Sequence, residues 1–287
     1  MTGLYQALLN GLMAGSILAV PAIGFTTIFA VLRYPSFAIA AYATLGAFAG
    51  WCIDTYVING VLPALAAGGL VAAMFGYVGE QRVLAPLRPA GSLIVAIGSV
   101  ALNLVLENVV RFAFGNDLRS FSLPVERDFI FLDLRVGPQQ IRNMLFACAL
   151  MAGVFAFLRF TRFGRAMRAV ADDADLARLK GIDPKKIAAV TIALSAGLVG
   201  MGGVLLGVET SIDPFTGNRI LLAVFAAAVL GGLGSIPGAV VGALAIGIAE
   251  ELALMVVPSL YRSAVGFAAI LLMLTFRPRG LLGERAV

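Results

Sequence analysis

The ionisable side chains inside long apolar runs are the residues of this sequence best suited to chemistry. Glu107 has Asn103 one helical turn before it and Arg111 one turn after it, the spacing of an ion pair on one helix face. Glu250 and Glu251 lie together in a second apolar run. A carboxylate inside an apolar helix can bind a proton, a cation or a polar solute, or it can form only a structural pair. Both interpretations of these glutamates stay open.

The composition excludes most enzyme chemistry. The 287 residues include no histidine, so Ser-His-Asp and Cys-His catalysis and histidine metal sites are absent. The two cysteines, Cys52 and Cys148, are too far apart to suggest a metal cluster. The sequence contains neither a Gly-x-x-x-x-Gly-Lys-Ser/Thr phosphate loop nor a Gly-x-Gly-Asp aspartyl motif. We therefore expect no catalytic residue, no bound metal and no cofactor, and any ATP must bind to another chain.

The apolar runs place the chain in a lipid bilayer. Hydrophobic residues make up 60% of the sequence and charged residues only 13%. Because lipid offers backbone amides no hydrogen-bond partner, continuously apolar runs of ~20 residues indicate membrane-spanning helices. The predicted fold class is an all-α polytopic membrane protein of about nine transmembrane helices, with eight to ten compatible with the pattern. The predicted spans are 4–32, 37–53, 61–80, 92–114, 142–160, 186–208, 219–233, 237–257 and 262–276.

The basic residues predict the orientation of these helices. Eight of them lie between Arg159 and Lys186, and the positive-inside bias makes that segment cytoplasmic. Counting spans from there places a turn from Arg82 to Arg88 and the carboxyl terminus in the cytoplasm, and the amino terminus outside. The prediction is a single transmembrane domain over 1–287, with a cytoplasmic loop at 161–186 and an external loop at 115–140. The net charge of +5 then reflects topology and not a nucleic-acid partner.

The predicted cytoplasmic loop contains a short amphipathic helix that ends near a glycine. Apolar side chains at three- and four-residue spacing predict one amphipathic helix over 164–179. Gly181 suits the left-handed cap that ends it, while Asp183 and Pro184 suit the start of the next span. Two interpretations of its charges stay open, contact with anionic lipid and docking on a cytoplasmic partner. The residues concerned are Arg165, Arg168, Asp172 and Asp173.

A glycine-rich stretch late in the chain prevents a straight helix. It can form a tight turn, or a broken helix with backbone groups open to a cavity. The charge count puts it on the cytoplasmic side, which favours a connecting turn. The residues of this break are Gly231, Gly232, Gly234, Pro237 and Gly238.

Three stretches together resemble the membrane permease subunits of branched-chain amino-acid ABC importers, the LivH type. Ala22-Ile23-Gly24-Phe25-Thr26 is similar to the opening span of that family. The residues from Gly164 to Ala169, followed by Leu179 to Asp183, are similar to its coupling loop. The stretch from Ala228 to Gly238, with Gly247-Ile248-Ala249-Glu250, is similar to its most recognisable signature. The similarity runs in order along essentially the whole chain.

The resemblance implies a set of partners. It implies that the helix over 164–181 couples to a separate ATPase, and that this chain pairs with a LivM-type second permease as a heterodimer. Two cytoplasmic ABC ATPase subunits would bind the ATP, and a periplasmic or surface solute-binding protein would deliver the solute. The expected location is the bacterial inner (cytoplasmic) membrane. The expected function is uptake of hydrophobic, branched-chain type amino acids or related small carboxylates or amides.

One segment departs from the family pattern. Where the family usually has Asn-Phe-Ala-His-Gly-Glu, this chain has Ser36-Phe37-Ala38-Ile39-Ala40-Ala41. Ile39 and Ala41 cannot form side-chain hydrogen bonds, so branched-chain amino acids become one candidate solute among several. The residues that we predict along a substrate path are Phe37, Ile39, Tyr42, Asn103 and Glu107.

A secondary transporter driven by protons or sodium is the alternative function. In that case Glu107 or Glu250 would be the coupling carboxylate. The chain alone would then transport its solute under an imposed ion gradient. An intramembrane enzyme is disfavoured by the absence of histidine, and a passive scaffold would leave the capped helix unexplained.

Overall fold

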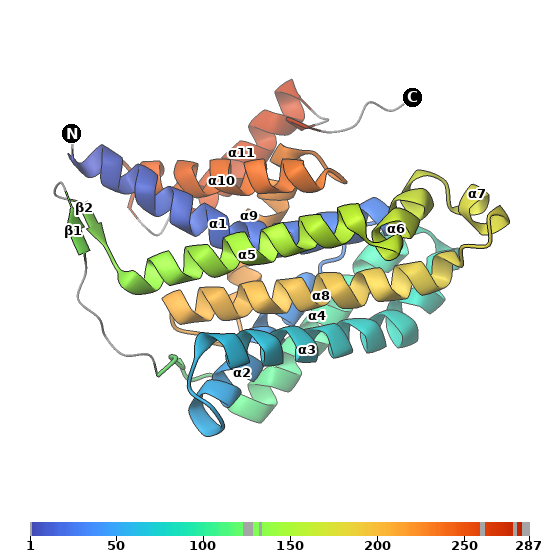
Figure 1. Cartoon of the computed structure of the whole chain (residues 1–287), viewed down its shortest axis with the longest axis horizontal. Coiled ribbons are helices and arrows are strands. Elements are labelled where there is room, and N and C mark those ends of the chain that lie inside the picture. The colour runs from blue at the N-terminus through green and yellow to red at the C-terminus, as the bar shows by residue number, and fades with distance from the viewer. Residues whose placement is uncertain (1, 123–128, 132–133, 259–261, 278–279, 283–287) are drawn as a thin grey trace.

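The computed structural model describes residues 2–122, 129–131, 134–258, 262–277 and 280–282, and many of its helices run along one long axis (Figure 1). The longer helices are α1 (Thr2–Leu32), α2 (Ile39–Tyr56), α3 (Val61–Gly79), α4 (Ser92–Phe114), α5 (Pro138–Phe160), α8 (Pro184–Glu209), α9 (Thr216–Gly231), α10 (Ile236–Ala253) and α11 (Arg262–Phe276). The shorter elements are η1 (Glu80–Leu84), η2 (Ala85–Ala90), α6 (Arg162–Asp172), α7 (Ala174–Leu179), and the antiparallel strands β1 (Phe129–Phe131) and β2 (Leu134–Val136).

The described residues confirm an all-α, multi-pass membrane fold. Six helical segments are long and apolar enough to cross a bilayer. Each of the nine predicted spans overlaps one of the longer helices, but α9 and α11 are shorter and α2 is less apolar. The number of crossings and the sidedness of the termini therefore stay predictions. The six segments are Gly3–Leu32, Val61–Ala90, Ser92–Phe114, Pro138–Phe160, Pro184–Glu209 and Ile236–Ala253.

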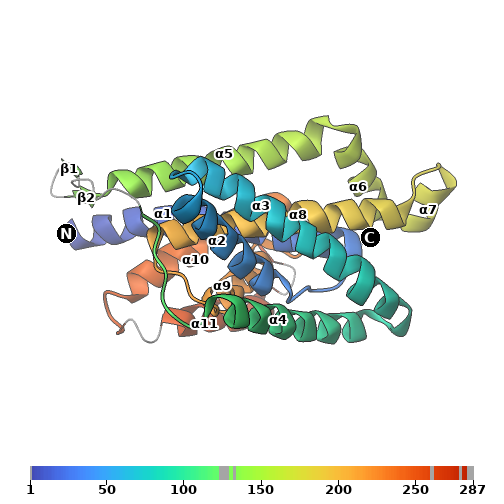
Figure 2. The same ribbon diagram turned by 90° about the horizontal axis from the view of Figure 1, so that it is seen from below.

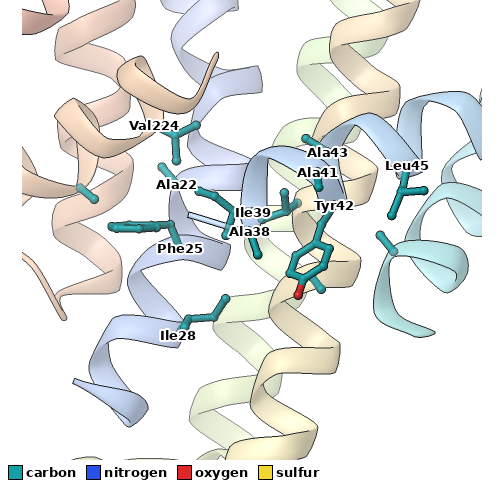
Figure 3. Packing of buried hydrophobic residues seen from close by; sticks show 14 of the residues in the cluster. Ala22, Phe25, Ile28, Ala38, Ile39, Ala41, Tyr42, Ala43, Leu45 and Val224 are labelled. Atoms are coloured by element: carbon teal, nitrogen blue, oxygen red, sulfur yellow. The ribbon is translucent and has the colours of Figure 1, made fainter. Parts of the chain in front are cut away.

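Helix α2 forms the centre of the core. Most of its residues are buried, and it packs against α3, α8 and α9. Figure 3 shows Ile39 of α2 between Phe25 of α1 and Tyr42 of α2, and all three side chains are almost completely buried. A helix that is apolar on every side can only be stable when it is surrounded. The sequence of α2 therefore fits its position inside the bundle.

Small residues let the central helices approach closely. A Cβ atom at Gly46 of α2 would overlap the backbone of Gly200 in α8, and one at Gly200 would overlap Gly68 of α3. Gly15 of α1 similarly lies against Gly247 of α10. Between membrane helices there is little hydrophobic driving force, so such close backbone packing is a main source of association.

The prediction of a turn from Arg82 to Arg88 is wrong, because these residues are helical. The chain continues past Gly79 as a π-helical turn (η1) and a 3-10 helix (η2), and it reverses at Gly91, which has φ +107°. The physical reason is that Glu80 and Arg88 form an ion pair with Glu80 buried, so these charges do not all face solvent.

The two predicted loops lie at opposite ends of the molecule. The β1–β2 hairpin, part of the predicted external loop 115–140, is at one end of the long axis, and α6 with α7 is at the other (Figure 1). Residues 123–128 and 132–133 of that loop fall outside the described residues. In the second view, α5 runs along one edge of the bundle and α4 and α11 along the opposite edge (Figure 2).

Candidate functional site

A cavity of about 450 Å³ lies among α1, α5, α8, α9, α10 and α11. Its size is within the range of small-molecule sites in proteins. Met13, Leu206 and Leu222 supply part of its apolar wall. The polar and charged residues that line it are Asn10, Gln140, Glu209, Thr210, Thr216, Arg219, Glu250 and Glu251.

Arg219 is the basic residue among the described residues that line this cavity. Its Nη2 atom lies 2.7 Å from the Asp213 carboxylate and 3.3 Å from Thr216 Oγ1, and 56% of its side chain is exposed. Asp213 also accepts a hydrogen bond from the Phe215 amide at 3.0 Å, in the turn that precedes α9. Sequence reasoning placed Arg219 at the edge of a span and gave it no role. Arg219 lines the same cavity as Glu250 and Glu251 because α9 packs on α10, and that packing has no local sequence signal.

Helix α9 begins in the interior of the bundle. The Gly217 amide donates a hydrogen bond to Thr44 Oγ1 of α2 at 3.0 Å, and a Cβ atom at Gly217 would overlap the carbonyl of Ala40. The next residue, Asn218, bonds with Asn103, which is the central residue of α4. The first turn of α9 therefore lies beside the middle of α4 and the first two turns of α2.

Glu107 belongs to a polar network between α4 and this first turn. Its carboxylate lies 2.8 Å from Arg111 Nη2 and accepts a hydrogen bond from Asn218 Nδ2 at 2.5 Å. Asn103 Nδ2 donates to Asn218 Oδ1 at 2.9 Å. The predicted Glu107–Arg111 ion pair is thus confirmed. The arginine also lies over the Phe215 ring, with 4.4 Å to its centre.

The five residues predicted along a substrate path do not line the cavity. Ile39 and Tyr42 are buried in the hydrophobic core, and the Phe37 amide donates to Ser99 Oγ at 2.9 Å. Asn103 and Glu107 belong to the network described above. A role for these five in transport stays a prediction. Glu250, which sequence reasoning weighed as a coupling carboxylate, does line the cavity.

A second buried polar cluster joins the α1–α2 connection to η1. Tyr34 donates a hydrogen bond to the Glu80 carboxylate at 3.0 Å, and Glu80 pairs with Arg88. Burial, together with the negative charge of Glu80, raises the pKa of the Tyr34 phenol far above its usual value. Tyr34 is therefore a neutral donor that fixes the end of α3 against the core.

The predicted single helix over 164–179 is instead two helices, α6 and α7. Asp173 is extended, with φ −151°, and its carboxylate accepts hydrogen bonds from the amides of Asp175 and Leu176, both at 2.9 Å. An aspartate that caps a new helix also ends the previous one, which the apolar periodicity did not reveal. Asp173 is thus a structural residue.

The remaining predicted caps of this segment are confirmed. Gly181 has φ +83°, and Asp183 accepts a hydrogen bond from the Lys185 amide at 3.0 Å at the start of α8. Arg168 donates to the carbonyl of Leu158 in α5, so it ties α6 to the preceding helix. Arg165 and Asp172 are exposed.

The glycine-rich break forms a turn between α9 and α10. Gly232 and Gly234 have φ +107° and +96°, and Ser235 Oγ accepts a hydrogen bond from the Gly238 amide at 3.2 Å to cap α10. Pro237 lies at the start of α10, where its missing amide hydrogen is tolerated. Gly231 and Gly238 pack backbone to backbone, with no space for a Cβ atom at either. The predicted connecting turn is confirmed.

Comparison with known proteins gives matches over most of the chain. The family model described as branched-chain amino acid transport system, permease component, matches residues 7–274. The chain is 32% identical to the high-affinity branched-chain amino acid permease BraD of Pseudomonas aeruginosa, over 98% of this chain and 96% of that protein. It is 31% identical to LivH of Escherichia coli K12, over the same shares. The structure of PsaBC from Streptococcus pneumoniae in complex with Fab has a similar fold, with a TM-score of 0.52, 14% identity, and coverage of 95% and 92%.

Proposed function

We propose, given that this chain belongs to the family of permease components of branched-chain amino acid transport systems, that it is the LivH-type permease subunit of an ABC importer. The solute that we propose is a hydrophobic amino acid of the branched-chain type. Energy would come from ATP hydrolysed on separate subunits, since the sequence has no phosphate loop. The partners would be a LivM-type permease, two ATPases and a solute-binding protein.

The α6–α7 segment is the observation that carries this proposal. Its buried side chains, Met167, Val170 and Ala177, pack with Ile187 of α8, which fixes the segment to the bundle. Arg33 adds a hydrogen bond from the end of α1 to the carbonyl of Ala171 at 2.7 Å. The opposite side exposes Leu176 and Leu179, 54% and 84% accessible, among charged residues. A rigid segment with exposed leucines suits docking on a protein and transmission of its movement.

The arrangement of α9 supports a transport role. Because α9 begins in the interior of the bundle, the chain before it is the non-helical connection from Thr210 to Phe215, and the cavity lies beside this connection. Interrupted helices beside a cavity are a common design for solute sites in membrane transporters. ATP-driven movement of α6 and α7 would reach this region through α8, against which both helices pack.

Purification of the tagged chain from native membranes in mild detergent tests the proposal. We expect a second permease and ATPases with phosphate-loop motifs to copurify. The reconstituted complex, with its binding protein, should take up radiolabelled L-leucine only when ATP is present on the ATPase side. Recovery of the chain alone, with uptake driven by a proton or sodium gradient, would instead establish the secondary-transporter alternative.

A further inference from the structure

We propose that the connection between α1 and α2, residues 33–38, transmits movement of α6 to the centre of the bundle, with Arg33 and Tyr34 as its positioning residues. Arg33 receives the movement from α6, and Tyr34 passes it to η1 at the end of α3. The inference rests on the proposed function, because it needs a partner ATPase that moves α6. It deepens that function by naming the residues that carry the movement within this chain.

Arg33 ends α1 in a conformation that an arginine seldom adopts. Its amide donates to the carbonyl of Phe29 at 2.9 Å, and its φ is +58°. Among the residues that the structure describes, it is the only one other than glycine with a positive φ. A glycine would take this left-handed position after a helix without steric cost. A strained residue of this kind points to a role for its side chain.

The Arg33 side chain holds the end of α6. Its Nη2 atom donates a hydrogen bond to the carbonyl of Ala171 at 2.7 Å. Ala171 is in the last turn of α6, where carbonyls lack a donor from their own helix and a positive charge is favourable. Figure 1 shows the end of α1 beside α6, and Val31 of α1 packs on the apolar cluster that joins α6 and α7 to α8. A displacement of α6 therefore reaches the end of α1 directly.

The next residue, Tyr34, connects the end of α1 to the end of α3. It is 2% exposed, and its hydroxyl donates to the Glu80 carboxylate at 3.0 Å. Glu80 is also buried, lies in the π-helical turn η1 and is paired with Arg88 of η2. Separation of the phenol from the carboxylate would leave buried polar groups without partners, which is costly. Tyr34 and η1 therefore move together.

The same connection also binds α4 and leads into the core. The Phe37 amide donates to Ser99 Oγ of α4 at 2.9 Å, and the buried Ser99 hydroxyl donates to the carbonyl of Ala96 at 2.6 Å. Helix α2 then begins at Ile39, which lies in the hydrophobic core. One short segment thus has fixed contacts with α6, η1 and α4. Hydrogen-bond networks between rigid elements are a physical means of coupling distant parts of a protein.

Hydrogen exchange of the complete transporter in nanodiscs tests the transmission directly. Exchange of the amides in 80–90 and in 162–172 is measured with and without a non-hydrolysable ATP analogue, because it reports local opening of each segment. In the wild type we expect the nucleotide to change the exchange of both segments. In Arg33→Asn and in Tyr34→Phe the change in 162–172 should remain, and the change in 80–90 should fall at least about fivefold, as for loss of coupling between two sites.

The two variants are chosen to keep the fold intact. Asparagine tolerates a positive φ but lacks the guanidinium, and phenylalanine keeps the buried ring of Tyr34 and removes only its hydroxyl. Arg33→Lys can still donate to a carbonyl and should recover part of the loss. Tyr77→Phe of α3 is the matched control, because this phenol is 46% exposed and is not a partner of the Glu80 carboxylate. Its exchange should equal that of the wild type.

Transport separates a transmitting role from a merely structural one. A loss of stability would lower ATP hydrolysis and uptake together, whereas a loss of transmission changes their ratio. The number of L-leucine molecules imported per ATP hydrolysed should therefore fall at least about fivefold in Arg33→Asn and in Tyr34→Phe. In Tyr77→Phe this ratio should stay at the wild-type value.

Three results overturn the inference. The first is exchange in 80–90 of the wild type that the nucleotide leaves unchanged, and the second is a change there that keeps its full size in either variant. The third is a wild-type ratio of import to ATP hydrolysis in both variants. Each can occur while the wild type imports L-leucine with ATP, in which case the proposed function stands without this connection. Import by the wild type that needs an ion gradient and no ATP contradicts the proposed function separately.

Discussion

At the scale of single residues, the Glu107–Arg111 pair shows how a charged group is kept among apolar helices. The carboxylate of Glu107 is 6% exposed, and it has partners on α4 and α9. Leaving one member of a buried pair without the other costs more than removing both, because the remaining charge loses its compensation. The pair therefore stabilises the contact between α4 and the first turn of α9.

This pairing gives a prediction for a double-mutant cycle. Glu107→Gln and Arg111→Gln should each lower the free energy of unfolding by about 1–3 kcal/mol, and the double variant by less than the sum. Denaturant unfolding in detergent can be followed through Trp51, the sole tryptophan. Strictly additive losses would show that the two side chains do not interact. Loss of uptake by a Glu107→Gln variant that still assembles normally would instead indicate a direct transport role.

At the scale of elements, the position of α9 depends on a glycine. Gly217→Ala should lower the free energy of unfolding by about 1–3 kcal/mol, because the added methyl group overlaps the Ala40 carbonyl and pushes α9 away from α2. Gly153→Ala in α5 is the matched control, since no atom lies within 4 Å of its added Cβ. The comparison is made by thermal unfolding of the two purified variants. Equal stabilities would contradict the close packing of α9 on α2.

The α6–α7 segment gives a second prediction at this scale. Asp172→Lys should insert into the membrane normally but reduce ATP-driven uptake at least about tenfold. The reason is that a reversed charge at the proposed docking surface repels the partner protein. Asp117→Lys, an equal reversal on the predicted external loop, where the side chain is 86% exposed, should leave uptake unchanged. Asp173 is unsuitable for this test, since its substitution removes the α7 cap. Normal uptake and ATP hydrolysis in Asp172→Lys would remove Asp172 from the docking surface.

The elements also show what the sequence could predict and what it could not. Gly181, Asp183 and the Glu107–Arg111 pair act within a few residues, so local spacing was sufficient. The contact between Asn218 and Glu107 joins positions more than a hundred residues apart, and the cavity around Arg219 is lined by residues of six helices. No periodicity encodes such long-range packing. The break at Asp173 was missed because the apolar spacing continues across the cap.

At the scale of the whole molecule, the sidedness of the loops is a direct prediction. In a Cys52→Ala, Cys148→Ala background, Asp117→Cys should react with a membrane-impermeant maleimide in intact spheroplasts. Asp175→Cys of α7 should react only after the membrane is opened, because the basic segment around it favours the cytoplasm. Labelling of Asp175→Cys in intact spheroplasts would reverse the predicted orientation, and Asp117→Cys labelled only after opening would do the same.

The end of α9 has a consequence for synthesis. The carbonyls of Leu230 and Gly231 accept hydrogen bonds from the amides of Leu281 and Leu282, at 2.8 and 3.0 Å. These amides leave the ribosome about fifty residues after their acceptors, a delay of roughly 3–10 s at ordinary rates of translation. Until then the last carbonyls of α9 depend on water or on the insertion machinery for partners. The turn between α9 and α10 is therefore completed late in translation, and nascent chains that stop before Leu281 should present it to proteases.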